Sequence, residues 1–456
     1  MSTRHCYAKG LFFRSLVGLL ILLFVGGTGC TKSTPTEQVA GENEETAIAA
    51  PSENESLFTA EEQAEIDAFC KSYGGSLEGD INSGIDSYGE TLLHYAVGSH
   101  SPAVIRFLVS KGADVNVKCM SGITPLHYAV VSNPNVEVTK FLVSQGADIH
   151  TIADGSTLLH KAAGNKNVEI AKFLVSQGLD VNAKCTYYAT MPLHYAARNE
   201  NTEVFHFLLS AGADIHAKSG KGESVLHYAA QNPNIEMVEY LVSQEMDVNI
   251  KDSNDMNPLY HAALNPNIEV VKFLVSHGAD VKVKGKNGDT PLHGAANNTN
   301  VEMTKFLVSE GADVNATDVS GWTPLLRAAA IGATGKSNTE VVKFLVSQGA
   351  NVNVKTFDGT TPLHRATDVR KMETVKILVS EGADVNARND KGRTPLHLIA
   401  EWTDWQAQWS RDIGVIDFLV SQGADVNAKD NEGKTPLELA EKNRSSVVAD
   451  RLSKLK

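Results

Sequence analysis

The sequence predicts an all-α solenoid in which helix-turn-helix units with hairpin-like fingers stack in a line. A short phrase restarts eleven times, most often at steps of 33 residues, and reads Thr-Pro-Leu-His in its best copies, at 124–127 and 290–293. A second phrase, Gly-Ala-Asp-Val-Asn, recurs in the same register, as at 311–315. A fixed period of this length is typical of stacked units that bury their apolar faces against their neighbours. The restarts fall at Thr91, Thr124, Thr157, Met191, Ser224, Asn257, Thr290, Thr323, Thr361, Thr394 and Thr435.

Each unit carries the start and stop signals of two short helices. In residues 114–146, Thr124 is a favoured N-cap and Pro125 suits the first helical position. Asn133 and Asn135 then interrupt the pattern, and we expect the first to end helix one in a left-handed conformation and the second to cap helix two. Gly146 is expected to end helix two as a C′ residue. The same stop recurs in most units, with Glu245 as the exception.

These phrases closely resemble the ankyrin repeat family: Thr-Pro-Leu-His, the Ala pair at 196–197, and Gly-Ala-Asp-Val-Asn. The resemblance extends from about Asp80 to the C-terminus and rests on many near-copies in register. It implies a stack of antiparallel helix pairs with projecting fingers. It also implies that the finger tips and the adjoining face of helix one contact partner proteins.

The chain divides into five expected segments. Residues 1–29 are expected to be a signal peptide, and residues 30–60, rich in Glu, an acidic disordered tether. Residues 61–90 are expected to form a partial N-terminal capping repeat, followed by the array at 91–434 and a C-terminal capping repeat at 435–456. Two insertions, near 331–337 and 402–410, lengthen the array at the turn between helices.

The first segment resembles a bacterial lipoprotein signal. A basic start precedes an apolar run at 15–25, which is too short to cross a bilayer. Thr28 and Gly29 then precede Cys30, the residue that would be lipidated, whereas Gly27 departs from the aliphatic residue that this family prefers. A plain signal peptide and an uncleaved anchor are the alternatives. The resemblance implies an exported protein held by lipid in a bacterial cell envelope, on the outer-membrane or periplasmic side.

The charge limits the classes of partner. The formal net charge is −13, and without residues 1–29, which carry three basic and no acidic residues, it is −13 − 3 = −16. Such acidity disfavours binding to nucleic acid or to an anionic bilayer by bulk charge. We expect a monomer that binds a protein partner and requires no cofactor.

Eight histidines occupy the repeated phrase, one in each of eight units. We expect them to be about 10 Å apart in neighbouring units, whereas zinc needs ligands at about 2.1 Å, so metal binding or catalysis by this set is disfavoured. The resemblance implies that each makes a structural hydrogen bond at the start of helix one. They are His94, His127, His160, His194, His227, His293, His364 and His397.

The insertions raise two alternatives. Ala330, Gly335, Lys336 and Ser337 fit a loose phosphate-binding-loop pattern, but the strand before such a loop is lacking, so a flexible loop is the better interpretation. In the second insertion, Trp402, Trp405 and Trp409 have helical spacing. They form either a small satellite core or an aromatic anchor for a partner.

Residues at the finger tips vary most between the copies, and exposed aromatic residues there favour contact with a partner over ordinary turn chemistry. Tyr187, Tyr188, Trp322 and Phe357 are therefore the candidates for partner binding, together with Trp402, Trp405 and Trp409. The other variable positions are Met120, Lys221, Met256, Lys286 and Arg393.

The sequence thus favours a non-catalytic scaffold for protein–protein interaction, because chemically active residues are dispersed along the stack. No catalytic, cofactor-binding or metal site is expected. An envelope enzyme or nucleotide-binding protein that uses the insertions, and a stiff spacer without a dedicated partner, are the alternatives.

Overall fold

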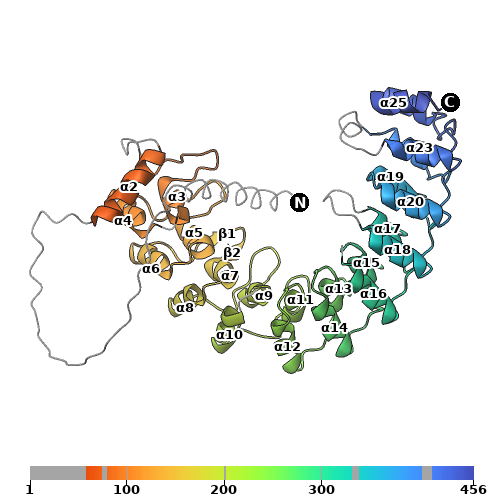
Figure 1. Ribbon diagram of the computed structural model, residues 1–456. Coiled ribbons are helices and arrows are strands. Elements are labelled where there is room, and N and C mark those ends of the chain that lie inside the picture. The colour runs from red at the N-terminus through yellow and green to blue at the C-terminus, as the bar shows by residue number, and fades with distance from the viewer. Residues whose placement is uncertain are drawn as a thin grey trace, which may run out of the picture. The chain divides into compact units, whose positions relative to one another are not determined.

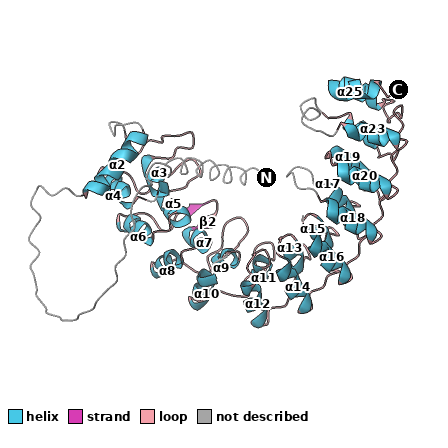
Figure 2. Ribbon diagram, viewed as in Figure 1, coloured by secondary structure: helices cyan, strands magenta, loops and turns pink. Residues whose placement is uncertain are grey.

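The computed structural model describes residues 58–73, 80–99, 101–199, 202–298, 300–330, 338–402 and 413–455. Figure 1 shows these residues as a series of helix pairs, and the helices in Figure 2 far outnumber the strands. The predicted signal peptide, residues 30–57 of the predicted tether with Cys30, and Gly335, Lys336, Ser337, Trp405 and Trp409 lie outside the described residues. No helix among the described residues has both the length and the apolarity needed to span a membrane.

Eleven units in the described part of the chain have two helices each, which confirms the all-α repeat fold. The first helices are α3 (Leu92–Ser99), α5 (Pro125–Ser132), α7 (Leu158–Ala163), α9 (Pro192–Ala197), α11 (Val225–Ala229), α13 (Pro258–Ala263), α15 (Pro291–Ala296), α17 (Pro324–Ala330), α19 (Pro362–Asp368), α21 (Pro395–Ile399) and α24 (Pro436–Lys442). The second helices are α4 (Pro102–Ser110), α6 (Val136–Ser144), α8 (Val168–Ser176), α10 (Thr202–Ser210), α12 (Glu236–Ser243), α14 (Ile268–Ser276), α16 (Val301–Ser309), α18 (Thr339–Ser347), α20 (Met372–Ser380), α23 (Gly414–Ser421) and α25 (Ser446–Ser453).

Contacts between units are sequential. The first helix of each unit packs against the first helix of the next, from α3 to α24. An additional helix, α2 (Ala60–Ser72), packs against α4 and so takes the place of a second helix ahead of the first complete unit. Its N-cap Thr59 and Glu62 form a capping box. The strand pairing among the described residues is confined to β1 (Ile152–Ala153) with β2 (Ser156–Thr157) and a bridge between Lys218 and Ser224.

The apolar core repeats with the units. In the unit that contains α5 and α6, Leu126, Ala129 and Val130 are buried on the first helix, as the sequence predicts, and Val138 and Leu142 on the second. Burying one such Leu contributes about 1.5–3 kcal/mol. Because neighbouring units cover these faces, no unit completes its core alone.

The two Asn residues between the helices act differently from one another. Asn135 caps α6 by accepting a hydrogen bond from the N–H of Glu137, as predicted. The left-handed conformation predicted for Asn133 is wrong, because this residue is extended, with φ −94° and ψ 119°. It is fully buried, donates from Nδ2 to the carbonyl of Val97 at 3.2 Å, and accepts from the N–H of Asn135. An extended backbone aims this side chain at the preceding unit.

The C′ glycines adopt the predicted left-handed conformation. Their φ values lie near +90°, and Glu245 adopts φ +61° at the equivalent position. The N–H groups that follow bond back to the end of helix two, as from Ala113 to the carbonyl of Leu108 at 3.0 Å. A side chain at this φ is strained, so Glu245 costs the unit stability.

Replacing Glu245 with Gly should raise the free energy of unfolding by about 1 kcal/mol, because the strain at positive φ is relieved. The matched change, Gly278→Ala, should lower it by a similar amount, since a Cβ there meets no atom within 4 Å and only the backbone strain is added. Urea unfolding of both variants measures the effect, and equal midpoints would contradict the strain argument.

Candidate functional site

Short hairpin-like fingers precede the first helices and form the surface that the sequence singles out. In the finger at 252–256, the N–H of Asp252 donates to the carbonyl of Met256 at 2.9 Å. Successive fingers are also joined at their tips, as by the bond from the N–H of Ser253 to the carbonyl of Lys221 at 2.8 Å. Such bonds hold most tips at a defined position relative to the next one.

Exposed apolar side chains gather on the first four fingers. Tyr88, Met120, Ile152, Tyr187 and Tyr188 are each more than half exposed, and Met120 reaches 81%. We call these five residues the N-terminal finger surface. The tip-to-tip bonds from Met120 to Tyr88 and from Thr186 to Gly155 link fingers one to two and three to four. Consecutive apolar residues on braced tips are the kind of surface that proteins use for contact.

Three of the predicted aromatic candidates lie exposed at tips. Tyr187 and Phe357 are 72% and 77% exposed, and Tyr188 is 53% exposed with the Lys221 ammonium 4.6 Å from its ring centroid. Tyr88, Ile152 and Val319 are also exposed at tips, although they were not among the predicted candidates. Their positions relative to the phrase could have identified them, because they occupy the same part of the finger.

Two other predicted candidates are occupied within the chain. The ring of Trp322 lies between two guanidinium groups, 5.1 Å from that of Arg327 and 4.8 Å from that of Arg365. Trp402 is only 3% exposed and belongs to the apolar core of the C-terminal units. Its ring is therefore not presented to a partner. Met256, at another variable position, is also buried.

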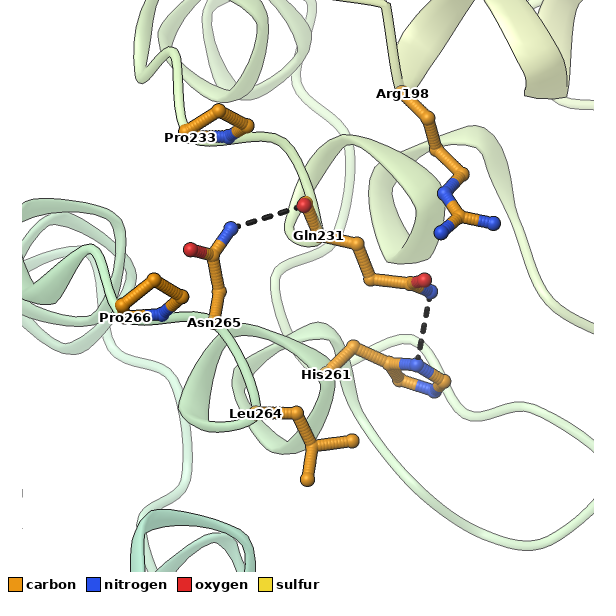
Figure 3. A pocket seen from close by; sticks show the side chains of 7 residues that line it. All are labelled: Arg198, Gln231, Pro233, His261, Leu264, Asn265 and Pro266. Atoms are coloured by element: carbon orange, nitrogen blue, oxygen red, sulfur yellow. Dashed lines mark hydrogen bonds between the residues drawn. The ribbon is translucent and has the colours of Figure 1, made fainter. Parts of the chain in front are cut away.

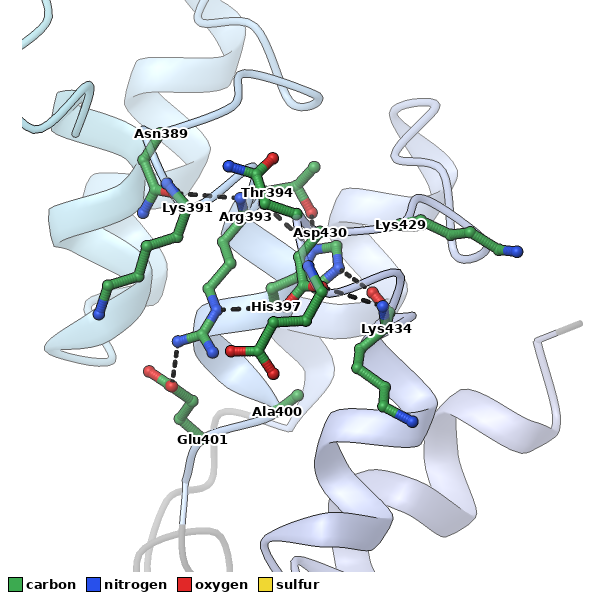
Figure 4. Close-up of polar contacts among 12 residues, drawn as sticks. Asn389, Lys391, Arg393, Thr394, His397, Ala400, Glu401, Lys429, Asp430 and Lys434 are labelled. Atoms are coloured by element: carbon green, nitrogen blue, oxygen red, sulfur yellow. Dashed lines mark hydrogen bonds and ion pairs between the residues drawn. The ribbon is translucent and has the colours of Figure 1, made fainter.

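Seven of the eight histidines of the phrase join consecutive units. Nδ1 of His94 accepts from the N–H of Thr91 at 3.1 Å, so the neutral ring carries its proton on Nε2. That Nε2 donates to the carbonyl of Ile123 in the next finger at 3.1 Å. Figure 4 shows the same arrangement at His397, which reaches the carbonyl of Lys434. The predicted structural hydrogen bond is confirmed and proves to have a second, inter-unit component.

Figure 4 also shows that Arg393, a variable finger residue, is engaged. Its guanidinium forms an ion pair with Glu401 and lies 3.5 Å from Asp430. Its side chain is 13% exposed. The residue therefore joins its own unit to the next finger and offers little surface to a partner.

Burial determines the protonation of these histidines. It lowers the pKa of His227 to about 4, with the neighbouring His261 as a second cause. It also lowers the pKa of His127 to about 4, where the charge of Lys161 adds to the effect. Nε2 of His127 is buried without a hydrogen-bond partner. The equivalent residue of the next finger, Ser156, lies in β2 and pairs there with Ala153.

A hollow of about 430 Å³ opens beside the first helices of three middle units. Arg198, Gln231, His261, Leu264 and Asn265 line it with two prolines, and Figure 3 shows the amide of Gln231 turned toward His261. The distance from Nε2 of Gln231 to Nδ1 of His261 is 3.2 Å. The lining combines polar side chains with the apolar surfaces of Leu264 and the two prolines, and it brings together no pair of nucleophile and base.

Comparison with protein families matches the model for "Ankyrin repeats (3 copies)" at 75–153, 126–219, 193–285, 280–356 and 330–430. Together these matches extend over well more than half of the chain. The chain belongs to the ankyrin repeat family. Ankyrin arrays are scaffolds for protein–protein interaction and are in general not catalytic.

Three viral relatives are similar over short stretches of this ankyrin array. An ankyrin repeat protein of fowlpox virus (strain NVSL), FPV223, is 44% identical over 12% of this chain and 38% of its own length. Ankyrin repeat protein 14 of vaccinia virus (strain Western Reserve) is 39% identical over 13% and 24%, respectively. Ankyrin repeat protein OPG025 of monkeypox virus is 40% identical over 11% and 8%. The matched part of this chain thus spans less than two fifths of each relative.

The neutral histidines should make the stability of the array depend on pH. The unfolded chain takes up protons below about pH 6.5, whereas His227 in the folded state stays neutral down to its lowered pKa. The stability is therefore complete above pH 6.5 and is lost as the pH falls toward 4. Each such histidine should contribute up to about 1.4 kcal/mol per pH unit within that window.

Urea unfolding at pH 7, 6 and 5 measures this loss, and the midpoint should fall at each step. In His227→Gln the fall should be smaller, because one titrating ring is removed. The exposed His277 serves as the control, so His277→Gln should behave as the unchanged protein does. A midpoint that is constant from pH 7 to pH 5 would show that the histidines are not held neutral by the fold.

Proposed function

We propose that this ankyrin array is a non-catalytic scaffold that binds a partner protein through the N-terminal finger surface. The main support for this proposal is that four consecutive fingers carry exposed apolar side chains. Tyr and Met residues supply large contact areas at protein interfaces, and exposed apolar clusters of this kind are uncommon outside binding sites. The eighth and ninth fingers, with Val319 and Phe357, offer a second, smaller apolar area.

The middle fingers have polar tips and lie between these two apolar areas. Lys221 and Lys286 lie at finger tips there, and Asp255 adopts φ +62° at the tip between them. A partner that contacts the N-terminal finger surface therefore meets an apolar patch with a charged border. This arrangement is typical of protein interfaces, in which a polar rim surrounds an apolar centre.

A photo-crosslinking residue at Met120 should form an adduct with the partner in intact cells, whereas the same residue at Leu264 should not. Both positions are exposed, but Leu264 lies at the end of α13 and away from the finger tips. The paired change Tyr187→Ser and Tyr188→Ser should reduce the adduct at least tenfold, since buried aromatic anchors carry much of the energy at interfaces.

The paired change should leave the melting temperature unchanged, because both side chains face solvent. Mass spectrometry of the adduct then identifies the partner. Equal adducts from Met120 and Leu264, or an adduct that the paired change does not reduce, would locate the binding surface elsewhere.

We further propose that the protein is exported and held by a lipid on Cys30 in a bacterial envelope. The support is the basic start, the short apolar run and the small residues before Cys30. A single acyl chain binds membranes only marginally, so stable anchoring requires more than one chain. The acidic segment at 30–60 would then separate the lipid from the array.

Labelling of growing bacterial cells with a radioactive or clickable palmitate tests the anchor. The label should appear in the unchanged protein and be lost in Cys30→Ser. Cys6→Ser provides the matched control, because Cys6 precedes the apolar run and should not be acylated. Labelling that persists in Cys30→Ser would refute a lipid at this position.

A further inference from the structure

One position on helix one, directly after the histidine of the phrase, faces acidic groups of two fingers. In the first unit, the Tyr95 hydroxyl donates to Asp86 of its own finger at 2.9 Å. In the unit that begins at Thr323, Arg327 takes this position and bonds two carboxylates. It reaches Asp318 of its own finger at 2.9 Å and Asp289 of the preceding finger at 3.0 Å. We call this position, with the acids that face it, the inter-finger slot.

His261 occupies the inter-finger slot of another unit. Asp252 and Glu223 precede it by 9 and 38 residues, the separations at which Asp318 and Asp289 precede Arg327. Two acids therefore flank His261 as two acids flank Arg327. The difference lies in the cation, because the guanidinium of Arg327 carries a permanent charge and a neutral imidazole carries none.

The polar atoms of this slot converge. One ligand atom each from Glu223, Asp252 and His261 lie within 4.8 Å of one another. Nε2 of His261 is 3.6 Å from Oδ2 of Asp252, which is longer than a hydrogen bond. That Nε2 atom is buried and has no hydrogen-bond partner. The side chain of Asp252 is only 3% exposed, so its charge is largely removed from solvent.

We propose that Glu223, Asp252 and His261 bind a divalent transition metal, and that zinc is the ion. An imidazole nitrogen among the donors suits zinc and disfavours calcium and magnesium, which prefer oxygen alone. Two carboxylates balance the charge of the ion. A tetrahedral zinc with ligands at 2.0–2.2 Å needs its donor atoms about 3.4 Å apart, which small side-chain rotations provide. Three protein ligands leave the fourth position to water.

Surrounding groups already orient these donors, as the outer shell of a metal site does. The hydroxyl of Tyr228 donates to Oε2 of Glu223 at 2.9 Å. Oδ1 of Asp252 accepts from the backbone N–H groups of Asn254 and Met256, which leaves Oδ2 toward His261. The amide nitrogen of Gln231 lies 3.2 Å from Nδ1 of His261. Rotating this amide by 180° would turn its oxygen to the ring, where it would accept the Nδ1 proton and free Nε2 for the ion.

Such an ion would join two units. Glu223 belongs to the finger before α11, whereas Asp252 and His261 belong to the next unit. In a repeat array, stability depends on the interfaces between neighbours, so an ion that bridges one interface stabilises that part of the array. This role is independent of a partner at the finger tips.

Titration of the purified full chain with zinc by calorimetry, and with cobalt(II) by visible absorption, tests the site. One equivalent should bind with a Kd in the micromolar range or lower, and cobalt should give the intense bands of four-coordination. His261→Arg should weaken binding at least 100-fold. This variant should stay folded, because Arg327 shows that the inter-finger slot accepts arginine.

His277→Arg is the matched control, since His277 is exposed after the second helix of the same unit, away from the inter-finger slot, and should bind no ion. Zinc should also raise the melting temperature of the unchanged protein and of the control but not that of His261→Arg. Two results would overturn the proposal: no binding at 100 µM metal, which would leave His261 as an ion-pair partner of the two acids, or binding that His261→Arg does not weaken.

Discussion

The structure depends on one constraint, which is that each unit satisfies its buried groups through its neighbours. The apolar faces are covered by the next helix pair, and the buried polar side chains cross the same interfaces. His94 bonds the following finger, and Asn133 bonds the preceding helix. An unpaired polar group in a dry interface costs about 1–3 kcal/mol, so these bonds fix the register between units as firmly as the apolar contacts do. Because these bonds lie inside the interfaces, the residues at the finger tips can vary widely without disturbing the array.

The same constraint explains how far the sequence could be interpreted. Period, helix starts and helix ends depend on local signals, so the N-cap at Thr124, the cap at Asn135 and the glycine stops were predictable. The conformation of Asn133 was not, because its partner, Val97, lies 36 residues away. Local chemistry favours a left-handed Asn at a helix end, and the bond to the preceding unit outweighs this preference.

The candidate site likewise has a part that local sequence predicts and a part that depends on contacts between units. Tip exposure follows from position in the repeat, so Tyr187, Tyr188 and Phe357 were predictable as exposed. Trp322 has a tip position too, yet two arginines lie against its ring, and one of them, Arg365, comes from the next unit, 43 residues away. The grouping of Glu223, Asp252 and His261 was likewise not predictable, since Glu223, 38 residues before His261, approaches it only when the fingers stack.

Departures from the repeat pattern gather around His261. Its unit has Tyr260 where most units have the bonding histidine, and Glu245, two residues after the end of α12, has a strained backbone. In a chain whose repeats otherwise agree, residues that depart from the repeat pattern indicate positions that serve a requirement other than the repeat fold. At a finger tip, a change of residue costs little stability, so variation there does not by itself identify a functional position. Inside an interface, variation does have a cost, because the charge of Asp252 is buried there. A cation that offsets this buried charge becomes part of the fold.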